Sequence, residues 1–191
     1  MYNLVMQEQQ NDRKILKDSF MHPDVFGILY EKYHDPIYRH LYKLTQDIQI
    51  TEDLTEETFL RVLEKRRLIL KSKIPFDRYI YKIATNLAIE YFRKERRKRK
   101  FQDNLQEKHK VKESAKRPER YEDELLKREI NNLPEIERVC IIMYYFEHKK
   151  MDEIAVTLGK AKSSISVLLK SARKHLYEKL RTKIDENRNN V

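Results

Sequence analysis

Glycine and proline are scarce in this chain, with 2 glycines and 5 prolines among 191 residues. A β-rich chain of this length needs more residues of these types in its turns. The scarcity therefore favours helices joined by short polar turns. The sequence also has a single cysteine, Cys140, which excludes an internal disulfide framework and is typical of a reducing cytoplasm.

Signals for a membrane span, for secretion and for catalysis are also missing from the sequence. No apolar run approaches the ~20 residues of a membrane span, and the N-terminus lacks the basic and apolar regions of a secretory signal. We therefore expect a cytoplasmic protein without membrane insertion. No Gly-rich phosphate loop, G-x-S-x-G, H-E-x-x-H or Cys/His cluster occurs, so we expect no catalytic residue, no metal and no cofactor. Cys140 lies in an apolar stretch and is interpreted as a core residue.

Positive charge is what the chain has in excess. Lys and Arg number 41 against 31 Asp and Glu, which gives a formal net charge of +10 and a pI of about 9.5. Such a protein usually binds a polyanion, either nucleic acid or an acidic membrane surface. Charge alone leaves a ribosome-associated or simply basic protein open as an alternative.

Helical periodicity runs through most of residues 20–97. A helix is expected near residues 25–33, and Asp35-Pro36 is typical of a helix restart with Asp as N-cap. Thr51 is expected to cap the next helix, whose first turn is acidic. A further helix follows Pro75. Its apolar stripe has i, i+3, i+4, i+7 and i+11 spacing and consists of Ile80, Ile83, Ala84, Leu87 and Tyr91.

The opposite side of this helix combines aromatic, amide and basic groups. Tyr79 can stack on a base, a contact of ~1–3 kcal/mol, and Asn86 can hydrogen-bond to a base edge. The basic run at residues 93–100 can hold phosphates, although a solvated helix end has the same composition. This side holds Arg78, Lys82, Thr85, Asn86, Ile89, Arg93 and Arg96, with Tyr79 at its edge.

Periodicity fades over residues 98–120, which are charged and have almost no large aliphatic side chains. We interpret this stretch as a linker. A second helical unit begins near Tyr121. The helix that Pro134 opens bears V-C-I-I-M-Y-Y-F and is apolar nearly all round, so we expect the whole run to be buried.

Two helices expected at residues 151–158 and 163–175 have helix-turn-helix spacing, with Gly159 at the turn. The outer side of the second helix carries short hydroxyls, lysines and one valine, which can bind phosphates, base edges and a thymine methyl group. An ordinary helical hairpin with a solvated face is the alternative interpretation. The candidates for DNA contact are Lys162, Ser163, Ser164, Ser166, Val167, Lys170, Ser171 and Lys174.

Together these segments resemble the extracytoplasmic-function (ECF) subfamily of the sigma-70 family of RNA polymerase sigma factors. T-E-D-L-T-E-E-T-F-L-R-V is similar to the segment that binds the polymerase core, and F-D-R-Y-I-Y-K-I-A-T-N-L-A-I-E-Y-F-R-K is similar to the strand-opening helix. L-P-E-I-E-R-V-C-I-I-M-Y-Y-F, M-D-E-I-A and S-A-R-K-H-L resemble parts of the C-terminal helix-turn-helix. The resemblance covers about residues 24–182, in the family's order.

The resemblance implies contacts with core RNA polymerase and with promoter DNA. An acidic helix face would bind the clamp helices of the largest polymerase subunit, through Asp53, Glu56, Glu57, Leu60 and Glu64. The melted non-template strand of the minus-10 element would be captured by Lys71, Lys73, Arg78, Tyr79, Lys82, Asn86, Arg93 and Arg96. The second unit would bind the polymerase flap and place its helix-turn-helix, residues 151–170, in the major groove of the minus-35 duplex.

Six positions depart from the family's pattern: Glu56, Tyr79, Thr85, Ala161, Leu168 and Ser171. Glu56 replaces the usual Gln and adds a charge to the core-binding face. Ala161 replaces the usual N-cap Ser, so Ser163 is the alternative cap. Leu168 and Ser171 stand where the family often has Arg, which predicts weaker phosphate or guanine contacts. An anti-sigma inhibitor is common in this family, but no residue here identifies one.

We therefore predict an all-α sigma factor with two small helical domains, of sigma region 2 and sigma region 4 type, joined by a flexible linker. The expected division is an N-terminal arm at 1–22, domains at 23–97 and 121–185, a linker at 98–120 and a polar tail at 186–191. A polymerase-independent helix-turn-helix regulator is the first alternative, and the acidic face argues against it. A nucleic-acid-processing enzyme is the second alternative, and it would need a metal or base constellation that the sequence does not present.

Overall fold

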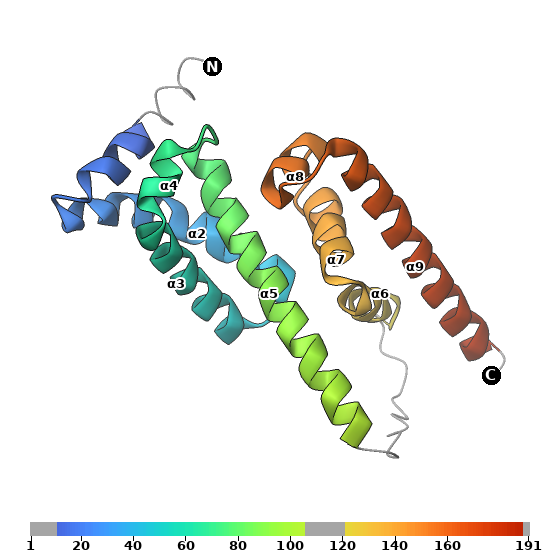
Figure 1. Ribbon diagram of the computed structural model, residues 1–191. Coiled ribbons are helices and arrows are strands. Elements are labelled where there is room, and N and C mark those ends of the chain that lie inside the picture. The colour runs from blue at the N-terminus through green and yellow to red at the C-terminus, as the bar shows by residue number, and fades with distance from the viewer. Residues whose placement is uncertain (1–10, 106–120, 189–191) are drawn as a thin grey trace. The chain divides into compact units, whose positions relative to one another are not determined.

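The computed structural model describes residues 11–105 and 121–188, and all regular secondary structure in these two ranges is helical (Figure 1). The predicted all-α class is confirmed. We refer to residues 11–105 as the N-terminal group and to residues 121–188 as the C-terminal group, and describe each by itself.

The N-terminal group starts with a helical segment at residues 11–18, which buries Ile15 and Leu16. The described part of the predicted N-terminal arm is thus packed against the rest of the group. The further elements are the 3-10 turn η1 (Pro23–Val25) and the helices α2 (Phe26–Thr45), α3 (Ile48–Glu64), α4 (Arg66–Lys71) and α5 (Phe76–Leu105).

Helix α2 runs unbroken through Pro36, so the predicted helix restart at Asp35-Pro36 is wrong. Proline inside a helix removes a hydrogen bond and costs about 3 kcal/mol. The apolar face of α2 continues across the proline. Four of its side chains are fully buried: Leu29, Ile37, Leu41 and Leu44. Burying each of these side chains contributes roughly 1.5–3 kcal/mol, so their packing outweighs the local cost of the proline.

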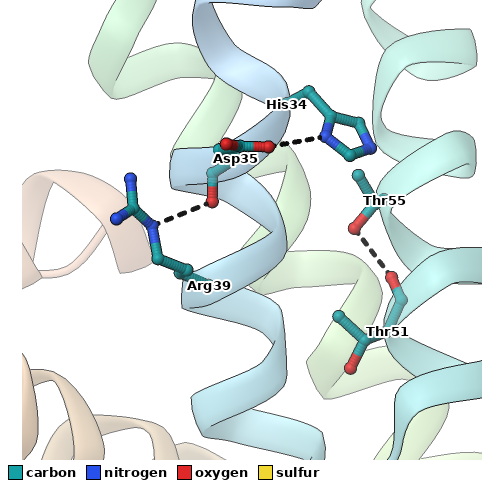
Figure 2. A network of polar contacts seen from close by, with 5 residues as sticks. All are labelled: His34, Asp35, Arg39, Thr51 and Thr55. Atoms are coloured by element: carbon teal, nitrogen blue, oxygen red, sulfur yellow. Dashed lines mark hydrogen bonds and ion pairs between the residues drawn. The ribbon is translucent and has the colours of Figure 1, made fainter.

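Helix α3 begins three residues before the predicted cap, since Asp47 caps it by accepting a hydrogen bond from the Ile50 amide at 2.9 Å. Thr51 lies inside the helix and is buried, so its prediction as the N-cap is wrong. Its hydroxyl donates to the Asp47 carbonyl at 2.5 Å. Figure 2 shows the equivalent contact one turn later, where the Thr55 hydroxyl donates to the Thr51 carbonyl at 2.7 Å. Because each hydroxyl is satisfied by the preceding turn, α3 can bury a threonine-rich face.

Helix α5 confirms most of its predicted core stripe, with Ile80, Ile83, Ala84 and Leu87 buried. Thr85 was placed on the outer side by its spacing, but it is fully buried and lies 2.9 Å from the His40 ring nitrogen Nε2 on α2. Its hydroxyl also contacts the carbonyl of Tyr81 at 2.8 Å. The predicted outer face of α5 is therefore narrower than the sequence indicated, and Ile89 is buried as well.

Helix α5 also extends into the predicted linker, because it continues from residue 98 to Leu105. Lys, Arg and Glu are good helix formers, and an i, i+3 ion pair of 2.8 Å joins Glu95 to Lys98. The rest of the predicted linker, residues 106–120, lies outside the described residues.

The C-terminal group contains the helices α6 (Tyr121–Asn132), α7 (Glu135–Ile141), α8 (Met151–Leu158) and α9 (Lys162–Arg188), and the π-helical turn η2 (Ile142–Phe146). Helix α9 packs against both α6 and α7. Two buried carboxylates cross these contacts. Glu129 of α6 accepts a hydrogen bond from Lys183, and Glu137 of α7 accepts one from Ser171 at 2.8 Å.

The run V-C-I-I-M-Y-Y-F is only partly buried, which corrects the sequence expectation. Its first five residues, 139–143, are buried, whereas Tyr144, Tyr145 and Phe146 are exposed. The transition from buried to exposed side chains lies within η2, where the Glu147 amide donates to the Ile142 carbonyl at 3.1 Å. The π-helical turn is wider than an α-helical turn, so the side chains after it point in other directions than the α-helical period predicts. Over the described parts of the chain, no helix is both long and apolar enough to span a bilayer.

The buried carboxyl of Glu129 predicts how the stability of the C-terminal group depends on pH. Burial raises the pKa of its carboxyl, but the hydrogen bond and charge of Lys183 outweigh burial, with smaller contributions from Asn132 and Arg128, so the pKa lies below its ordinary value of 4.5. A depressed pKa stabilises the fold above pH 4.5, and this contribution is lost as the pH falls through the folded-state pKa.

We therefore expect Glu129→Gln to lower the free energy of unfolding by about 1–3 kcal/mol at pH 7. The free energy of unfolding of this variant should also decrease less than that of the wild type as the pH is lowered. Urea titrations followed by circular dichroism at pH 7 and at lower pH would measure both effects. Glu124→Gln, at an exposed position of the same helix, should keep the wild-type pH dependence. An unchanged acid dependence in Glu129→Gln would contradict the assignment.

Candidate polymerase and promoter interfaces

The predicted core-binding residues form one stripe on α3, which we call the acidic stripe: Asp53, Glu56, Glu57, Leu60 and Glu64. Their i, i+3, i+4, i+7 and i+11 spacing places them on one side of the helix. Glu57 is half-buried and the other four are exposed. Leu60 is 55% exposed in the middle of the acidic groups. A single exposed leucine is ordinary on a protein surface, so the role of Leu60 in partner binding stays a prediction.

Arginine neutralises part of this stripe. Arg61 donates from Nε to Glu57 Oε1 at 2.7 Å, and its Nη1 lies 3.9 Å from Glu64 Oε2. Asp53 and Glu56 make no ion pair within the described residues. The unpaired negative charge is therefore concentrated at the N-terminal half of the stripe.

The back of α3 is anchored on α2 by aromatic rings. Phe59, which is buried, lies next to Leu60 in sequence and contacts the rings of Phe26, Tyr30 and His34 at centroid distances of 6.3, 4.6 and 6.5 Å. Figure 2 shows His34 directed from α2 toward α3, while its Nδ1 lies 3.1 Å from the Asp35 carboxylate. Arg39 extends to the other side of α2 and donates to the Asp35 carbonyl at 3.3 Å. These contacts fix the orientation of α3 and of its outer stripe.

The predicted minus-10 residues lie at the end of α4, on the loop between α4 and α5, and along α5. Lys71, the last residue of α4, and Lys73, in the loop, are exposed, whereas Tyr79 and Lys82 are half-buried. Tyr79 lies in the first turn of α5, where its amide donates to the Pro75 carbonyl at 3.0 Å. The remaining exposed members are Arg78, Asn86, Arg93 and Arg96.

Arg13 was missed by the sequence analysis, although it contacts the same loop. Its guanidinium donates to the main-chain carbonyls of Ile69, Leu70, Ser72 and Ile74. These contacts span 56 to 61 positions of sequence, so no local pattern could have indicated them. The available signal was the Ile15-Leu16 pair, which is buried and docks the N-terminal segment.

The predicted helix-turn-helix has the expected turn between α8 and α9. Gly159 has a positive φ of 61°, and the Lys160 amide donates to the Ala155 carbonyl at 2.9 Å. Helix α9 begins at Lys162, so Ser163 lies in its first turn and the prediction of Ser163 as the cap is wrong. Ile165, Leu169 and Ala172 are buried, as their spacing predicts.

Six of the candidates for minus-35 contact are exposed: Lys162, Ser163, Ser166, Val167, Lys170 and Lys174. Val167 is 67% exposed, which suits an apolar contact. Ser164 and Ser171 are half-buried. The Ser171 hydroxyl donates to Glu137 Oε1 at 2.8 Å, and His175 Nδ1 lies 2.7 Å from the other oxygen of this carboxylate. Ser171 therefore takes part in holding α9 against α7. Its predicted contact with DNA stays a separate prediction.

Two family models match the chain in series. The model of sigma-70 region 2 matches residues 29–98, and that of sigma-70 region 4 matches residues 123–176. The first range contains the acidic stripe and the minus-10 candidates, and the second contains the helix-turn-helix. The exact domain boundaries stay a prediction.

Characterised relatives extend the similarity over most of the chain. RNA polymerase sigma factor YlaC of Bacillus subtilis is 24% identical over 172 residues, which cover 87% of this chain and 98% of that protein. The ECF RNA polymerase sigma factor SigM of the same organism is 26% identical over 151 residues, 78% of this chain and 90% of that protein.

A solved structure has the same fold. The sigma factor RpoE, in its complex with the anti-sigma factor NepR from Bartonella quintana, superposes with a TM-score of 0.55 at 18% identity, over 82% of this chain and 96% of that chain. Both regions of the family are thus present in order, on helices that carry the residues described above. The chain belongs to the sigma-70 family of RNA polymerase sigma factors and, within it, to the extracytoplasmic-function subfamily.

Proposed function

We propose that this sigma factor binds core RNA polymerase through the acidic stripe, captures the melted minus-10 strand with the α4–α5 loop and α5, and reads the minus-35 duplex with α9. The observation that carries the proposal is the separation of surfaces by chemistry. The acidic stripe suits a protein partner, while basic and aromatic groups on other helices suit DNA.

The acidic stripe would bind the clamp helices of the largest polymerase subunit. This binding requires basic and apolar side chains on the clamp helices. Asp53 and Glu56 supply charges that steer the encounter, and Leu60 supplies an apolar anchor. The packing of Phe59 against α2 preorganises the stripe, so little ordering is required on binding.

Strand capture would use groups of three kinds near the start of α5. Lys71, Lys73 and Arg78 are exposed cations that attract phosphates. Tyr79 keeps part of its ring accessible for stacking on an unpaired base. Asn86, exposed two turns farther along α5, can hydrogen-bond to a base edge.

Duplex recognition would use the first turns of α9. The exposed Lys162, Lys170 and Lys174 would contact phosphates, the last of them from a 3.8 Å ion pair with Glu178. Ser166 and Val167 would offer a hydroxyl and a methyl surface to base edges. The C-terminal group would also bind the polymerase flap. Since the solved RpoE structure contains an anti-sigma factor, we include an inhibitor of that class among the proposed partners.

Run-off transcription is the direct test of the proposal. We expect the chain to initiate transcription from a limited set of genomic fragments only when core RNA polymerase is present. Free protein should bind the same promoters weakly, because its recognition groups are divided between two small units. Sequence-specific duplex binding without any core-dependent initiation would instead favour a polymerase-independent regulator.

The docking role of the acidic stripe can be tested by charge reversal. Glu56→Lys combined with Glu57→Lys should weaken core binding by roughly tenfold or more, because rim charges at an interface become repulsive. Fluorescence anisotropy with labelled chain would measure the affinity, and thermal melting followed by circular dichroism would report on the fold. Glu31→Lys combined with Asp24→Lys changes the net charge equally at exposed positions outside the stripe. Equal affinities of the two double variants would contradict the assignment.

Tyr79 should act in strand opening more than in initial binding. Tyr79→Ala removes a stacking contact of ~1–3 kcal/mol, so we expect roughly a tenfold or greater loss of open complex on a duplex promoter and a smaller loss on a pre-melted template. Permanganate footprinting would measure the open complex. Tyr79→Phe retains the ring and should remain near wild type. Wild-type yields of Tyr79→Ala on both templates would refute the role.

A further inference from the structure

Two consecutive residues of the N-terminal helical segment, Asp12 and Arg13, support the α4–α5 loop, Arg13 by direct contact and Asp12 through α2. Neither residue belongs to the predicted DNA-binding surfaces, and both lie outside the range that the region 2 model matches. The contacts of Arg13 are nevertheless directed at the part of the chain that carries Lys71 and Lys73.

Arg13 binds the N-terminal end and the body of the loop. Its Nη2 donates to the carbonyls of Ile69, Leu70 and Ser72 at 3.2, 2.6 and 2.8 Å, and its Nη1 donates to that of Ile74 at 3.2 Å. Ile69 and Leu70 lie in the last turn of α4, where the Ser72 amide also donates to the Ile69 carbonyl at 3.1 Å. The guanidinium therefore adds to the cap of α4 and continues into the loop, where it binds the carbonyls of Ser72 and Ile74.

Asp12 fixes the same segment to α2 and, through it, to the start of α5. Its carboxylate is almost fully buried and accepts hydrogen bonds from Tyr33 at 2.5 Å and from Lys32 at 2.7 Å. The Tyr33 ring packs edge-on against Phe76, the first residue of α5, at a centroid distance of 5.2 Å. Asp12 thereby supports the C-terminal end of the loop.

A second arginine, on α4, contacts the N-terminal segment in return. Arg66, at the start of α4, donates from Nη1 to the Ser19 carbonyl at 2.9 Å, and its guanidinium lies 4.3 Å from the centre of the Phe20 ring. The N-terminal segment and the α4 region are thus held together at two places. This reciprocal arrangement makes the position of Arg13 relative to the loop well defined.

The end of α4 and the loop after it show an alternating pattern that follows from these contacts. The carbonyls of residues 70, 72 and 74 bind the guanidinium, while the side chains of Lys71 and Lys73, between them, are exposed. The Ile74 amide is also bound, since it donates to the Ser72 hydroxyl at 3.0 Å. Fixing the carbonyls on the inner side determines where the two lysines emerge.

We propose that Arg13 is a positioning residue for strand capture: it holds the α4–α5 loop in the shape that presents Lys71 and Lys73 to the single-stranded minus-10 DNA. This inference rests on the function proposed above. Arginine is required because its planar fork offers several donors in fixed directions, whereas lysine offers one point charge. Arg13 acts through the loop and need not touch DNA itself.

The test compares Arg13→Gln, Arg13→Lys and the control Lys14→Gln, which removes the same charge from the adjacent exposed position. The probe is a labelled single strand with the non-template minus-10 sequence of a promoter found by run-off transcription, bound to holoenzyme. We expect Arg13→Gln to bind this strand about tenfold more weakly, because a displaced loop would no longer hold Lys71 and Lys73 against the phosphates. Arg13→Lys should be intermediate, and the control should match wild type.

Two further measurements distinguish positioning from general destabilisation. Hydrogen exchange of the free full-length chain should accelerate at the Ile74 amide in Arg13→Gln and remain unchanged in α3. The affinity for core polymerase should stay at the wild-type level. Strand affinity of Arg13→Gln equal to wild type would overturn the inference, as would a parallel loss of core binding and thermal stability. Failure of the wild-type chain to initiate at any fragment would instead overturn the proposed function.

Discussion

The structure depends on how its helix ends are satisfied. Each α-helix leaves amide and carbonyl groups unpaired at its termini, and a chain with 2 glycines can rarely use the glycine cap that ends many helices. Only Gly159 fills that role, while Gln46 and His148 adopt positive φ without being glycine. At two further helix ends a charged side chain contributes to the cap: Asp47 at the start of α3 and Arg13 at the end of α4. The second of these contacts joins parts of the N-terminal group that lie far apart in sequence.

Hydrophobic spacing predicted the helical fold well because the buried faces are long. Four residues of the predicted stripe of α5 and the residues Ile165, Leu169 and Ala172 of α9 follow the 3.6-residue period and are buried as expected, whereas Tyr91 is only half-buried. Local rules failed where tertiary contacts outweighed them. Pro36 would end an isolated helix, but the core on both sides of it keeps α2 continuous. Thr85 is polar and its spacing predicts an exposed position. Its hydroxyl nevertheless hydrogen-bonds with His40 and with the Tyr81 carbonyl of the preceding turn, and these contacts offset the cost of burying a polar group.

The candidate interfaces were predictable to different degrees for a similar reason. The acidic stripe follows from spacing on one helix, and its exposure needs no knowledge of the rest of the fold. The involvement of Ser171 with Glu137 could not be foreseen, because it depends on how α7 lies against α9. The support of the α4–α5 loop by Arg13 depends on residues more than fifty positions apart, which no periodic pattern contains. Residue type and spacing thus indicate which groups are available for binding, while tertiary structure decides which of them are already occupied.

The N-terminal segment has a practical consequence for any shortened form of this protein. The recognisable region 2 match begins at residue 29, and trimming the chain there would keep every residue of α3, although it would remove Phe26 and its contact with Phe59. It would also delete Asp12, Arg13 and the Ser19 carbonyl, so the last turn of α4 would lose the Arg13 guanidinium and Arg66 would lose its acceptor in the N-terminal segment. Such a fragment would still be recognised as a sigma region 2 domain and would retain the residues of the acidic stripe. Its loop would have to find a new shape, so sequence similarity alone would set the boundary of the functional unit too late in the chain.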